Sequence, residues 1–122
     1  MKQILVIDDS LAIRKAIRRI LEPMGFAVTE APDGQEALQV CLGATRLDAV
    51  LCDIDMPVMD GLTFLERLRA SKSVNQPPVI MCTTHNTFEK IQRALELGAN
   101  EYIMKPFDAE IIGGKLIACG VR

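Results

Sequence analysis

The chain lacks long runs of basic residues and long runs of apolar residues, and each absence excludes a class of function. Its lysines and arginines stand at most in pairs, and its formal net charge is -2 with an isoelectric point near 5.4. Proteins that bind nucleic acid directly carry a basic patch, so we expect no direct nucleic-acid binding. No apolar stretch approaches the roughly 20 residues of a membrane helix, and the first predicted strand begins too early for a signal peptide. We therefore expect a cytoplasmic protein without membrane insertion.

Paired cysteine and histidine motifs are missing as well. The four cysteines are Cys41, Cys52, Cys82 and Cys119. They show neither the CxxC nor the Cys/His spacing that zinc ligation or a redox pair needs. We interpret them as reduced, apolar residues of strands and helices. Cys52 and Cys82 precede two candidate site residues, and we expect them in adjacent buried strands without a functional disulfide.

Five short apolar segments alternate with amphipathic segments along the 122 residues, a length that suits one domain over residues 1–122. The predicted strands are Gln3–Ile7, Phe26–Ala31, Ala49–Cys52, Val79–Cys82 and Tyr102–Met104. Five helices are predicted. The first begins near Ser10 and ends before Gly25, the second covers Gln35–Leu42, and the third begins at Gly61. The fourth covers Phe88–Leu97, and the fifth begins after Asp108 as its N-cap. Strands without clear alternation suit a parallel sheet covered on both faces. We expect a doubly wound, flavodoxin-like (βα)5 fold with strand order 2-1-3-4-5.

Two of the predicted helices have unusual compositions. The last one contains Gly113-Gly114 in its interior, where each glycine costs about 1 kcal/mol relative to alanine, so we expect it to be short or frayed. The first one carries a group of basic residues away from its apolar side: Arg14, Lys15, Arg18 and Arg19. We interpret them as a solvated face, with a docking surface for an acidic partner as the alternative.

Reactive side chains follow four of the predicted strands at their C-terminal ends. They are the pair Asp8 and Asp9, then Asp53, Thr83 and Lys105. The C-terminal ends of parallel strands lie along one edge of a sheet, and ligands bind where the strand order reverses. With the order 2-1-3-4-5 this point lies between the first and third strands. We therefore expect all three carboxylates to meet in one crevice.

Three ionised carboxylates in one crevice repel one another unless some are protonated or a cation is bound. Oxygen ligands favour a hard ion, and Mg²⁺ is the abundant choice. Asp9 and Asp53 would bind it directly and Asp8 through water, which leaves Asp53 as a nucleophile for an aspartyl phosphate. Lys105 and Thr83 could bind the transferred phosphoryl group. Each residue alone could be a cap or a surface residue, but their joint placement favours a functional site.

Five segments match a known family: 6–10, Asp33-Gly34, 53–61, 78–83 and 98–107. With them the whole chain resembles the receiver domain of two-component response regulators, and in extent the single-domain chemotaxis type. The resemblance implies that Asp53 accepts a phosphoryl group from the phosphohistidine of a sensor histidine kinase or a histidine phosphotransfer protein. It also implies that Asp8 and Asp9 are the acidic pair of a Mg²⁺ site that the backbone carbonyl of Asp55 completes.

The same resemblance implies a switch and an output surface. Thr83 and Tyr102 match the coupled switch residues, whose hydroxyl moves toward the phosphoryl group while the ring turns inward. The Lys105-Pro106 bond is cis in the family. A face of the fourth helix, fifth strand and fifth helix would bind a downstream protein or a second copy of the chain. The protein would not be an enzyme beyond self-catalysed phosphoryl acceptance and slow autodephosphorylation.

Three positions near the site are candidates for tuning dephosphorylation. Thr84 stands where the family usually has Ala or Gly, so its side chain is expected to narrow access for donors or water. Asp55 and His85 occupy variable positions that tune phosphoryl lifetime in the family. For His85, the one histidine of the chain, we favour a loop residue without a catalytic role over a residue that positions a proton or water.

Two other functions fit parts of the sequence. Asp53-Ile54-Asp55 after an apolar strand also resembles the nucleophile and acid/base pair of haloacid-dehalogenase-type phosphatases. That family places the motif after its first strand, with Thr or Val where Pro57 stands here. A phosphorylation-independent interaction module is the second alternative, against which the complete set of reactive residues argues.

Overall fold

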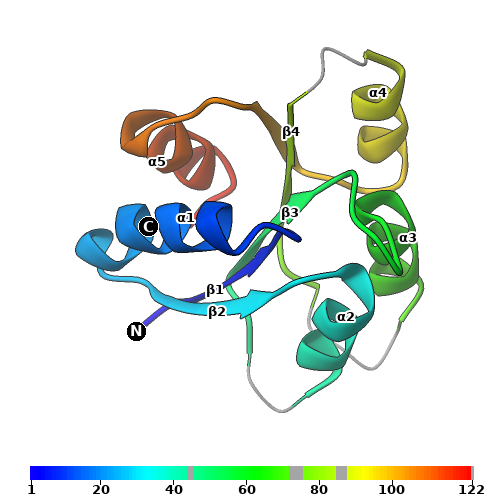
Figure 1. The fold of residues 1–122 in the computed structure, drawn as a ribbon, viewed down its shortest axis with the longest axis horizontal. Coiled ribbons are helices and arrows are strands. Elements are labelled where there is room, and N and C mark those ends of the chain that lie inside the picture. Colours follow the sequence, from blue (N-terminus) through cyan, green and yellow to red (C-terminus); the bar gives the residue numbers. More distant parts are fainter. Residues whose placement is uncertain (44–45, 72–75, 85–87, 122) are drawn as a thin grey trace.

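Strands and helices alternate along the chain as the hydrophobic pattern predicts, in a computed structural model that describes residues 1–43, 46–71, 76–84 and 88–121. The elements are β1 (Gln3–Ile7), α1 (Leu11–Leu21), η1 (Glu22–Met24), β2 (Ala27–Ala31), α2 (Gly34–Leu42), β3 (Ala49–Asp53), α3 (Gly61–Ala70), β4 (Val79–Thr83), α4 (Phe88–Glu96), β5 (Glu101–Met104) and α5 (Ala109–Ala118). The strands form a five-stranded parallel sheet in the order β2-β1-β3-β4-β5. Helices α1 and α5 cover one face, and α2, α3 and α4 cover the other (Figure 1). The predicted fold and strand order are confirmed.

The central strands are apolar throughout because both of their faces are buried. In β1, Ile4 and Val6 pack with residues of α1 and α5, whereas Leu5 and Ile7 pack with residues of α2 and α3. Successive side chains of a strand point to opposite faces, so each of the two cores takes half of the strand. This arrangement explains why the sequence shows continuous apolar runs in place of alternation. Within the described parts of the chain, no helix is long and apolar enough to cross a membrane.

Cys52 and Cys82 lie in the neighbouring strands β3 and β4, as predicted. Cys52 belongs to the core beneath α2 and α3, and Cys82 belongs to the core beneath α1 and α5. The sheet therefore separates the two sulfur atoms. Burial raises the pKa of the Cys82 thiol to about 12, so it stays protonated. Both cysteines are packing residues, in agreement with the sequence-based interpretation.

The first helix ends earlier than the apolar pattern predicts. Helix α1 stops at Leu21, and a short 3-10 turn with Pro23 follows before Gly25. Proline has no backbone N–H and its ring disfavours the interior of an α-helix, so the chain tightens there. Gly25 has a φ of 93°, a left-handed conformation that glycine adopts without a steric penalty. The turn directs the chain into β2.

The expectation that the last helix is short or frayed is wrong. Helix α5 runs without interruption over 10 residues, with Gly113 and Gly114 inside it, and Asp108 caps its N-terminus by accepting a 2.9 Å hydrogen bond from the Ile111 N–H. Ile112 and Leu116 are each 1% exposed. Burying two such side chains contributes about 4 kcal/mol, which exceeds the helix penalty of two glycines. Tertiary packing thus maintains the helix.

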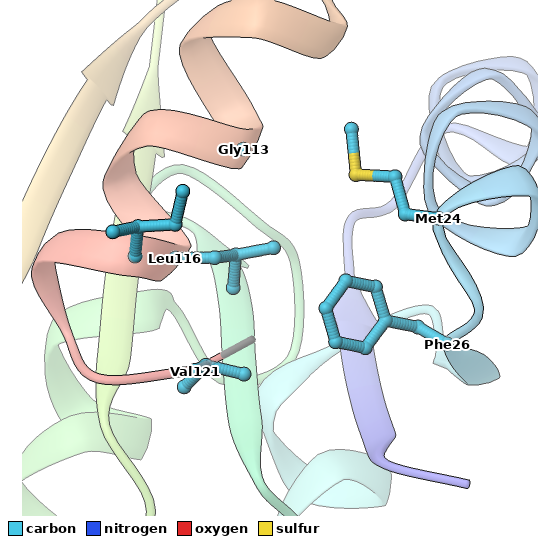
Figure 2. Close-up of a pocket in the computed structure, with 6 residues that line it drawn as sticks. Met24, Phe26, Gly113, Leu116 and Val121 are labelled. Carbon is cyan, nitrogen blue, oxygen red and sulfur yellow. The ribbon is translucent and has the colours of Figure 1, made fainter.

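An apolar cavity lies between α5 and the turn that joins α1 to β2. Figure 2 shows Met24 and Phe26 facing Leu116 and Val121 across it. The cavity has a volume of about 400 Å³, and Gly113 lines the α5 side. A methyl group at position 113 would lie 3.6 Å from the Met24 methyl carbon, which is an ordinary van der Waals contact.

We predict that Gly113→Ala stabilises the protein by about 1 kcal/mol, because alanine is the better helix former and the cavity accepts its methyl group. Gly114→Ala should give a similar gain, since no neighbouring atom of the described residues lies within 4 Å of the position that its methyl group would take. Urea unfolding followed by circular dichroism measures both effects. Gly120→Ala is the control: Gly120 has a φ of 80°, so alanine there should destabilise. A loss of stability in Gly113→Ala would contradict this account of the cavity.

Three of the basic residues of α1 share one carboxylate of the neighbouring strand. Glu30 of β2 accepts hydrogen bonds from Arg14 at 3.1 Å, Lys15 at 2.8 Å and Arg18 at 2.7 Å. Burial opposes ionisation of this carboxyl group, but the three donors lower the pKa of Glu30 to about 2. These three side chains therefore bind β2, and the one carboxylate offsets one of their three positive charges. Lys15 and Arg19 are exposed, as a solvated face predicts.

We predict that Glu30 contributes stability that decreases at acid pH. Its pKa is about 2 in the folded protein against an ordinary value of 4.5, so the contribution is complete above about pH 4.5 and is lost as the pH falls toward 2. At pH 7, Glu30→Gln should cost about 2 kcal/mol, and at pH 3 less than half of that. Urea titrations of wild type and Glu30→Gln at both pH values measure the difference. An equal cost at pH 7 and pH 3 would contradict the prediction.

Candidate functional site

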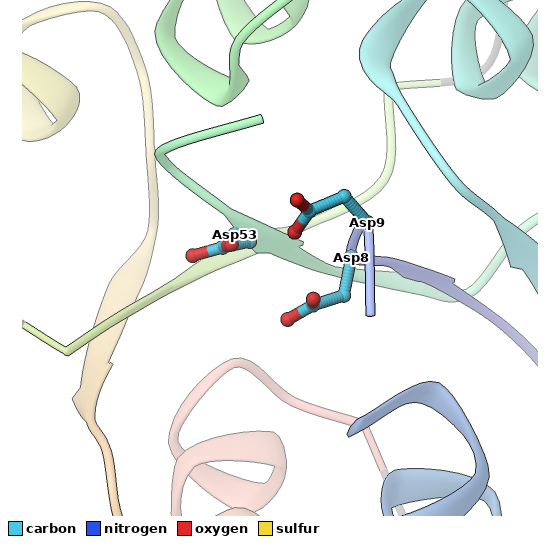
Figure 3. A group of neighbouring side chains, drawn as sticks. All are labelled: Asp8, Asp9 and Asp53. Carbon is cyan, nitrogen blue, oxygen red and sulfur yellow. The ribbon is translucent and has the colours of Figure 1, made fainter. Parts of the chain in front are cut away.

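Three carboxylates meet at the C-terminal edge of the sheet, where the strand order reverses between β1 and β3. One carboxylate oxygen from each of Asp8, Asp9 and Asp53 lies within 4.8 Å of the others. Figure 3 shows Asp8 and Asp9 leaving the end of β1 and Asp53 leaving the end of β3. Asp8 is buried, Asp9 is exposed, and Asp53 is intermediate. The predicted convergence of these residues is confirmed.

Lys105 joins this cluster from the far end of the chain. Its ammonium lies 2.8 Å from a carboxylate oxygen of Asp8 and 3.6 Å from one of Asp53. The residue follows β5, whose end is fixed to β4 because the Lys105 N–H donates a 2.8 Å hydrogen bond to the Thr83 carbonyl. The long side chain reaches from there across β4 and β3 to β1. Lys105 thus places one positive charge between two carboxylates.

Burial and neighbouring charges change the acidity of the cluster. Burial raises the pKa of Asp53 to about 6, and the Asp8 carboxylate adds to this effect while the Lys105 ammonium opposes it. For Lys105, burial opposes the charged form, but the hydrogen bond to Asp8 and the charge of Asp53 raise its pKa above the usual value. Lys105 is therefore a fixed cation at neutral pH. A further positive charge in the cluster would favour ionised Asp53.

The loop between β3 and α3 folds closely against Asp53. The Ile54 N–H donates a 2.9 Å hydrogen bond to the Asp53 carboxylate, and the Gly61 N–H donates one of 2.8 Å to the Ile54 carbonyl. A methyl group on Gly61 would collide with the backbone carbonyl of Asp53, so only glycine fits there. Val58 in the same loop has a φ of 67°, a strained conformation for a β-branched residue. The tight loop fixes Asp53 at its position.

Thr83 and Tyr102, the two predicted switch residues, lie at different depths. Thr83 ends β4 and is 1% exposed; its neighbour Cys82 pairs with Asp53 in the sheet register. Tyr102 on β5 is 37% exposed, and the centroid of its ring lies 5.3 Å from the Lys115 ammonium. The ring therefore lies on the surface. The inward movement of the ring stays a prediction.

The three tuning candidates have different surroundings. The exposed Asp55 side chain accepts a 2.7 Å hydrogen bond from Lys90 of α4. Thr84 is exposed and, with Lys105, lines a cavity of about 410 Å³ between α1 and the segment after β5. His85 lies outside the described residues. The Lys105-Pro106 peptide bond is cis, as the resemblance implies.

Sequence reasoning did not find two contacts of the site. The Arg14 guanidinium donates a 2.6 Å hydrogen bond to the backbone carbonyl of Asp8, and the Lys90 ammonium binds Asp55. For Arg14 the sequence offers no signal, because its acceptor is a backbone carbonyl. Nothing in the sequence pairs Lys90 with Asp55, which is 35 residues away. Both contacts depend on how helices pack against the sheet edge.

Comparison with curated proteins gives relatives in two-component signalling. The chain is 38% identical over 110 residues to the sensor histidine kinase CheAY of Helicobacter pylori, covering 89% of this chain but only 14% of that protein. It is 35% identical over 115 residues to the chemotaxis protein CheY of Pseudomonas aeruginosa, covering 93% of this chain and 92% of that protein. The match thus extends over almost the whole of the chemotaxis protein CheY but over only a small part of the kinase CheAY.

A solved structure agrees with these relatives. The receiver domain of the sensor histidine kinase PA1611 from Pseudomonas aeruginosa, which has a magnesium ion coordinated in its active-site cleft, superposes with a TM-score of 0.87. It is 28% identical, and the match covers 97% of this chain and 96% of that one.

A family model identifies the group to which the chain is related. The model of the response regulator receiver domain matches residues 4–116. The Asp53-Ile54-Asp55 motif begins at the last residue of the third strand and not at the end of the first. The interpretation as a haloacid-dehalogenase-type phosphatase is therefore not supported. The chain belongs to the family of response regulator receiver domains.

Proposed function

We propose that Asp53 is the phosphoacceptor of this receiver domain, over residues 1–122, and that Asp8, Asp9 and Asp53 bind Mg²⁺. The observation that carries the proposal is the placement of Asp53 at the reversal of strand order, with two more carboxylates and the Lys105 ammonium around it. A nucleophile, a cation site and a fixed positive charge thus lie together. These are the groups that phosphoryl transfer to a carboxylate needs.

The donor set suits Mg²⁺. Three carboxylates within 4.8 Å of one another offer hard oxygen ligands, which this ion prefers. Asp55 would add its backbone carbonyl, as the resemblance to the family implies, while its side chain binds Lys90. The magnesium ion in the PA1611 receiver domain supports the same assignment by similarity. When bound, Mg²⁺ offsets the negative charge that collects where the phosphoryl oxygens meet the carboxylates.

The chemical step belongs to Asp53. One of its carboxylate oxygens attacks the phosphorus of a phosphohistidine, so an O–P bond forms while the P–N bond breaks and the imidazole nitrogen keeps the electron pair. Lys105 neutralises part of the charge on the transferred group, and the Thr83 hydroxyl donates a hydrogen bond to it. The protein performs no other catalysis than this acceptance and the slow hydrolysis of its own aspartyl phosphate. Asp55, Thr84 and His85 tune the rate of that hydrolysis.

The donor is a sensor histidine kinase or a histidine phosphotransfer protein, the type of protein with which receiver domains of two-component systems interact. We assign the output to the surface of α4, β5 and α5, which binds a downstream protein or a second copy of the chain. Support comes from a groove of about 380 Å³ between α4 and β5, which Phe88, Leu95 and Tyr102 line with exposed apolar surface. We place the protein in the cytoplasm, as is general for this family.

Labelling with a small phosphoryl donor tests the proposal. Acetyl phosphate with Mg²⁺ should add one phosphoryl group to the protein, and removal of Mg²⁺ by EDTA should prevent the addition, because the carboxylates would then repel the donor. Intact mass spectrometry measures the extent of labelling. Equal labelling with and without Mg²⁺ would contradict the metal site, and no labelling under any condition would contradict the phosphoacceptor.

A further inference from the structure

The peptide group that joins Asp8 to Asp9 is held by a side chain of α1. The Asp8 N–H donates a 3.1 Å hydrogen bond to the Ala31 carbonyl of β2, which continues the sheet pairing by one residue. Beyond this point the chain leaves β1. The next carbonyl, that of Asp8, accepts a 2.6 Å hydrogen bond from the Arg14 guanidinium. Two contacts thus hold the chain where the sheet pairing ends: the one from Arg14, and the 2.9 Å hydrogen bond that the Ser10 N–H donates to the Asp8 carboxylate.

Arg14 is fixed in turn by Glu30. The Arg14 Nε donates a 3.1 Å hydrogen bond to Glu30, and the two side chains are 13% and 11% exposed. Lys15 and Arg18 hold the other oxygen of the same carboxylate. A guanidinium is a rigid fork that can bind a carboxylate and a carbonyl at the same time, which a lysine ammonium on a flexible stem does less well. The network therefore presents the Arg14 donor to Asp8 in one orientation.

We propose that Arg14 is a positioning residue for the metal site, because it sets the plane of the Asp8–Asp9 peptide and so the direction in which the Asp9 carboxylate points, with Glu30 as its anchor. The inference rests on the proposed function, in which Asp8 and Asp9 bind Mg²⁺. Asp9 is exposed and lies on the short connection between β1 and α1, so the peptide plane governs its direction. Groups that orient metal ligands from the outer shell typically change metal affinity by about 10- to 100-fold.

An electrostatic role and a positioning role of Arg14 predict opposite changes in Mg²⁺ affinity when the residue is replaced. A guanidinium near three carboxylates repels a divalent cation, so removing the charge alone should strengthen Mg²⁺ binding. Loss of the hydrogen bond to the Asp8 carbonyl should weaken it, because the carboxylates would no longer be held in the orientation for binding. The sign of the change therefore separates a positioning role from an electrostatic one.

Arg18 offers a matched control for Arg14. Its Nε binds Glu30 at 2.7 Å and its Nη2 binds a backbone carbonyl, that of Val28, at 3.2 Å. Arg18 also binds Glu22 through its Nη1 at 3.1 Å. Arg14→Lys and Arg18→Lys both disturb a contact to Glu30 and a contact to a backbone carbonyl, and both keep the charge. Only Arg14→Lys affects the carbonyl of Asp8.

Isothermal titration calorimetry with Mg²⁺ tests the proposal. We expect Arg14→Lys and Arg14→Met to bind Mg²⁺ about 10-fold more weakly than wild type, and Arg18→Lys to stay within about 2-fold. With acetyl phosphate, labelling of both Arg14 variants should be slow at limiting Mg²⁺ and should return to the wild-type rate at saturating Mg²⁺. Urea unfolding of each variant checks that the proteins are folded.

Several outcomes would overturn the proposal. These are unchanged or tighter Mg²⁺ binding in the Arg14 variants, equal weakening in Arg18→Lys, and a slow labelling rate that saturating Mg²⁺ does not restore. Loss of the folded state in both Arg14 variants would assign Arg14 to fold stability and overturn it as well. A wild-type protein that does not bind Mg²⁺ would instead overturn the proposed metal site, and the positioning role with it.

Discussion

Asp53→Asn is expected to abolish phosphoryl incorporation. The substitution replaces the proposed attacking carboxylate by an amide, which is a poor nucleophile, while it keeps the size of the side chain. The Ile54 N–H can still donate its hydrogen bond to the amide oxygen, so the β3–α3 loop should keep its conformation. Incubation with acetyl phosphate and Mg²⁺ followed by intact mass measurement should detect no adduct in the variant.

Asp55→Asn is the matched control for this experiment. It makes the same chemical change two residues away, where the side chain is exposed and binds Lys90. We expect Asp55→Asn to accept one phosphoryl group as the wild type does, although the lifetime of the adduct can differ. A stable phosphoryl adduct on Asp53→Asn would place the acceptor elsewhere in the chain. A complete loss of labelling in Asp55→Asn would show that the reaction depends on both carboxylates.

Arg69→Ala is expected to destabilise the fold by about 3 kcal/mol. The Arg69 guanidinium makes five hydrogen bonds: two to the Gly98 carbonyl at 3.1 and 3.0 Å, and one each at 2.9 Å to the Gln76 side chain, the Pro77 carbonyl and the Asn100 side chain. All of these acceptors are neutral oxygens, and burial lowers the pKa of Arg69. Arg69 therefore joins the end of α3 to the segments that lead into β4 and β5.

Urea unfolding compares Arg69→Ala with Arg67→Ala, two residues earlier on the same helix. Arg67 is exposed, so its replacement should change the free energy of unfolding by less than about 0.5 kcal/mol. Arg69→Lys should also destabilise, because an ammonium has three donors and cannot make all five hydrogen bonds. Stabilities of Arg69→Ala and Arg67→Ala that agree within error would show that this network is not important for the fold.

Much of the site could be predicted from the order of residues along the chain. Asp8, Asp53 and Thr83 each stand at the end of an apolar run, and parallel strands bring such ends to one edge of a sheet. The strand order needed one further step, namely that right-handed crossovers place β1 and β3 next to each other. Both steps use only local patterns and the chirality of the chain. These two steps were sufficient to predict that the three carboxylates lie close together.

Other features depended on contacts that no local pattern encodes. The length of α5 followed from the burial of Ile112 and Leu116, which outweighs the glycine penalty. Taken alone, the basic residues of α1 indicate a solvated face, but Glu30 of β2 binds Arg14 and Arg18. In each case the deciding partner comes from another element, so the helix sequence alone shows neither the length of α5 nor the contacts of Arg14 and Arg18.

The sequence by itself determined the strands and helices, the edge of the sheet where the site lies, and the identity of the residues there, because periodicity and chain direction are local properties. Only the tertiary structure decided which groups touch. Lys105 lies 2.8 Å from Asp8, a residue 97 positions away, but 3.6 Å from Asp53, and Arg14 binds a backbone carbonyl. A backbone acceptor leaves no trace in the sequence, and the reach of a long side chain depends on how helices and strands pack. The geometry around the acidic pair therefore arises only in the folded protein.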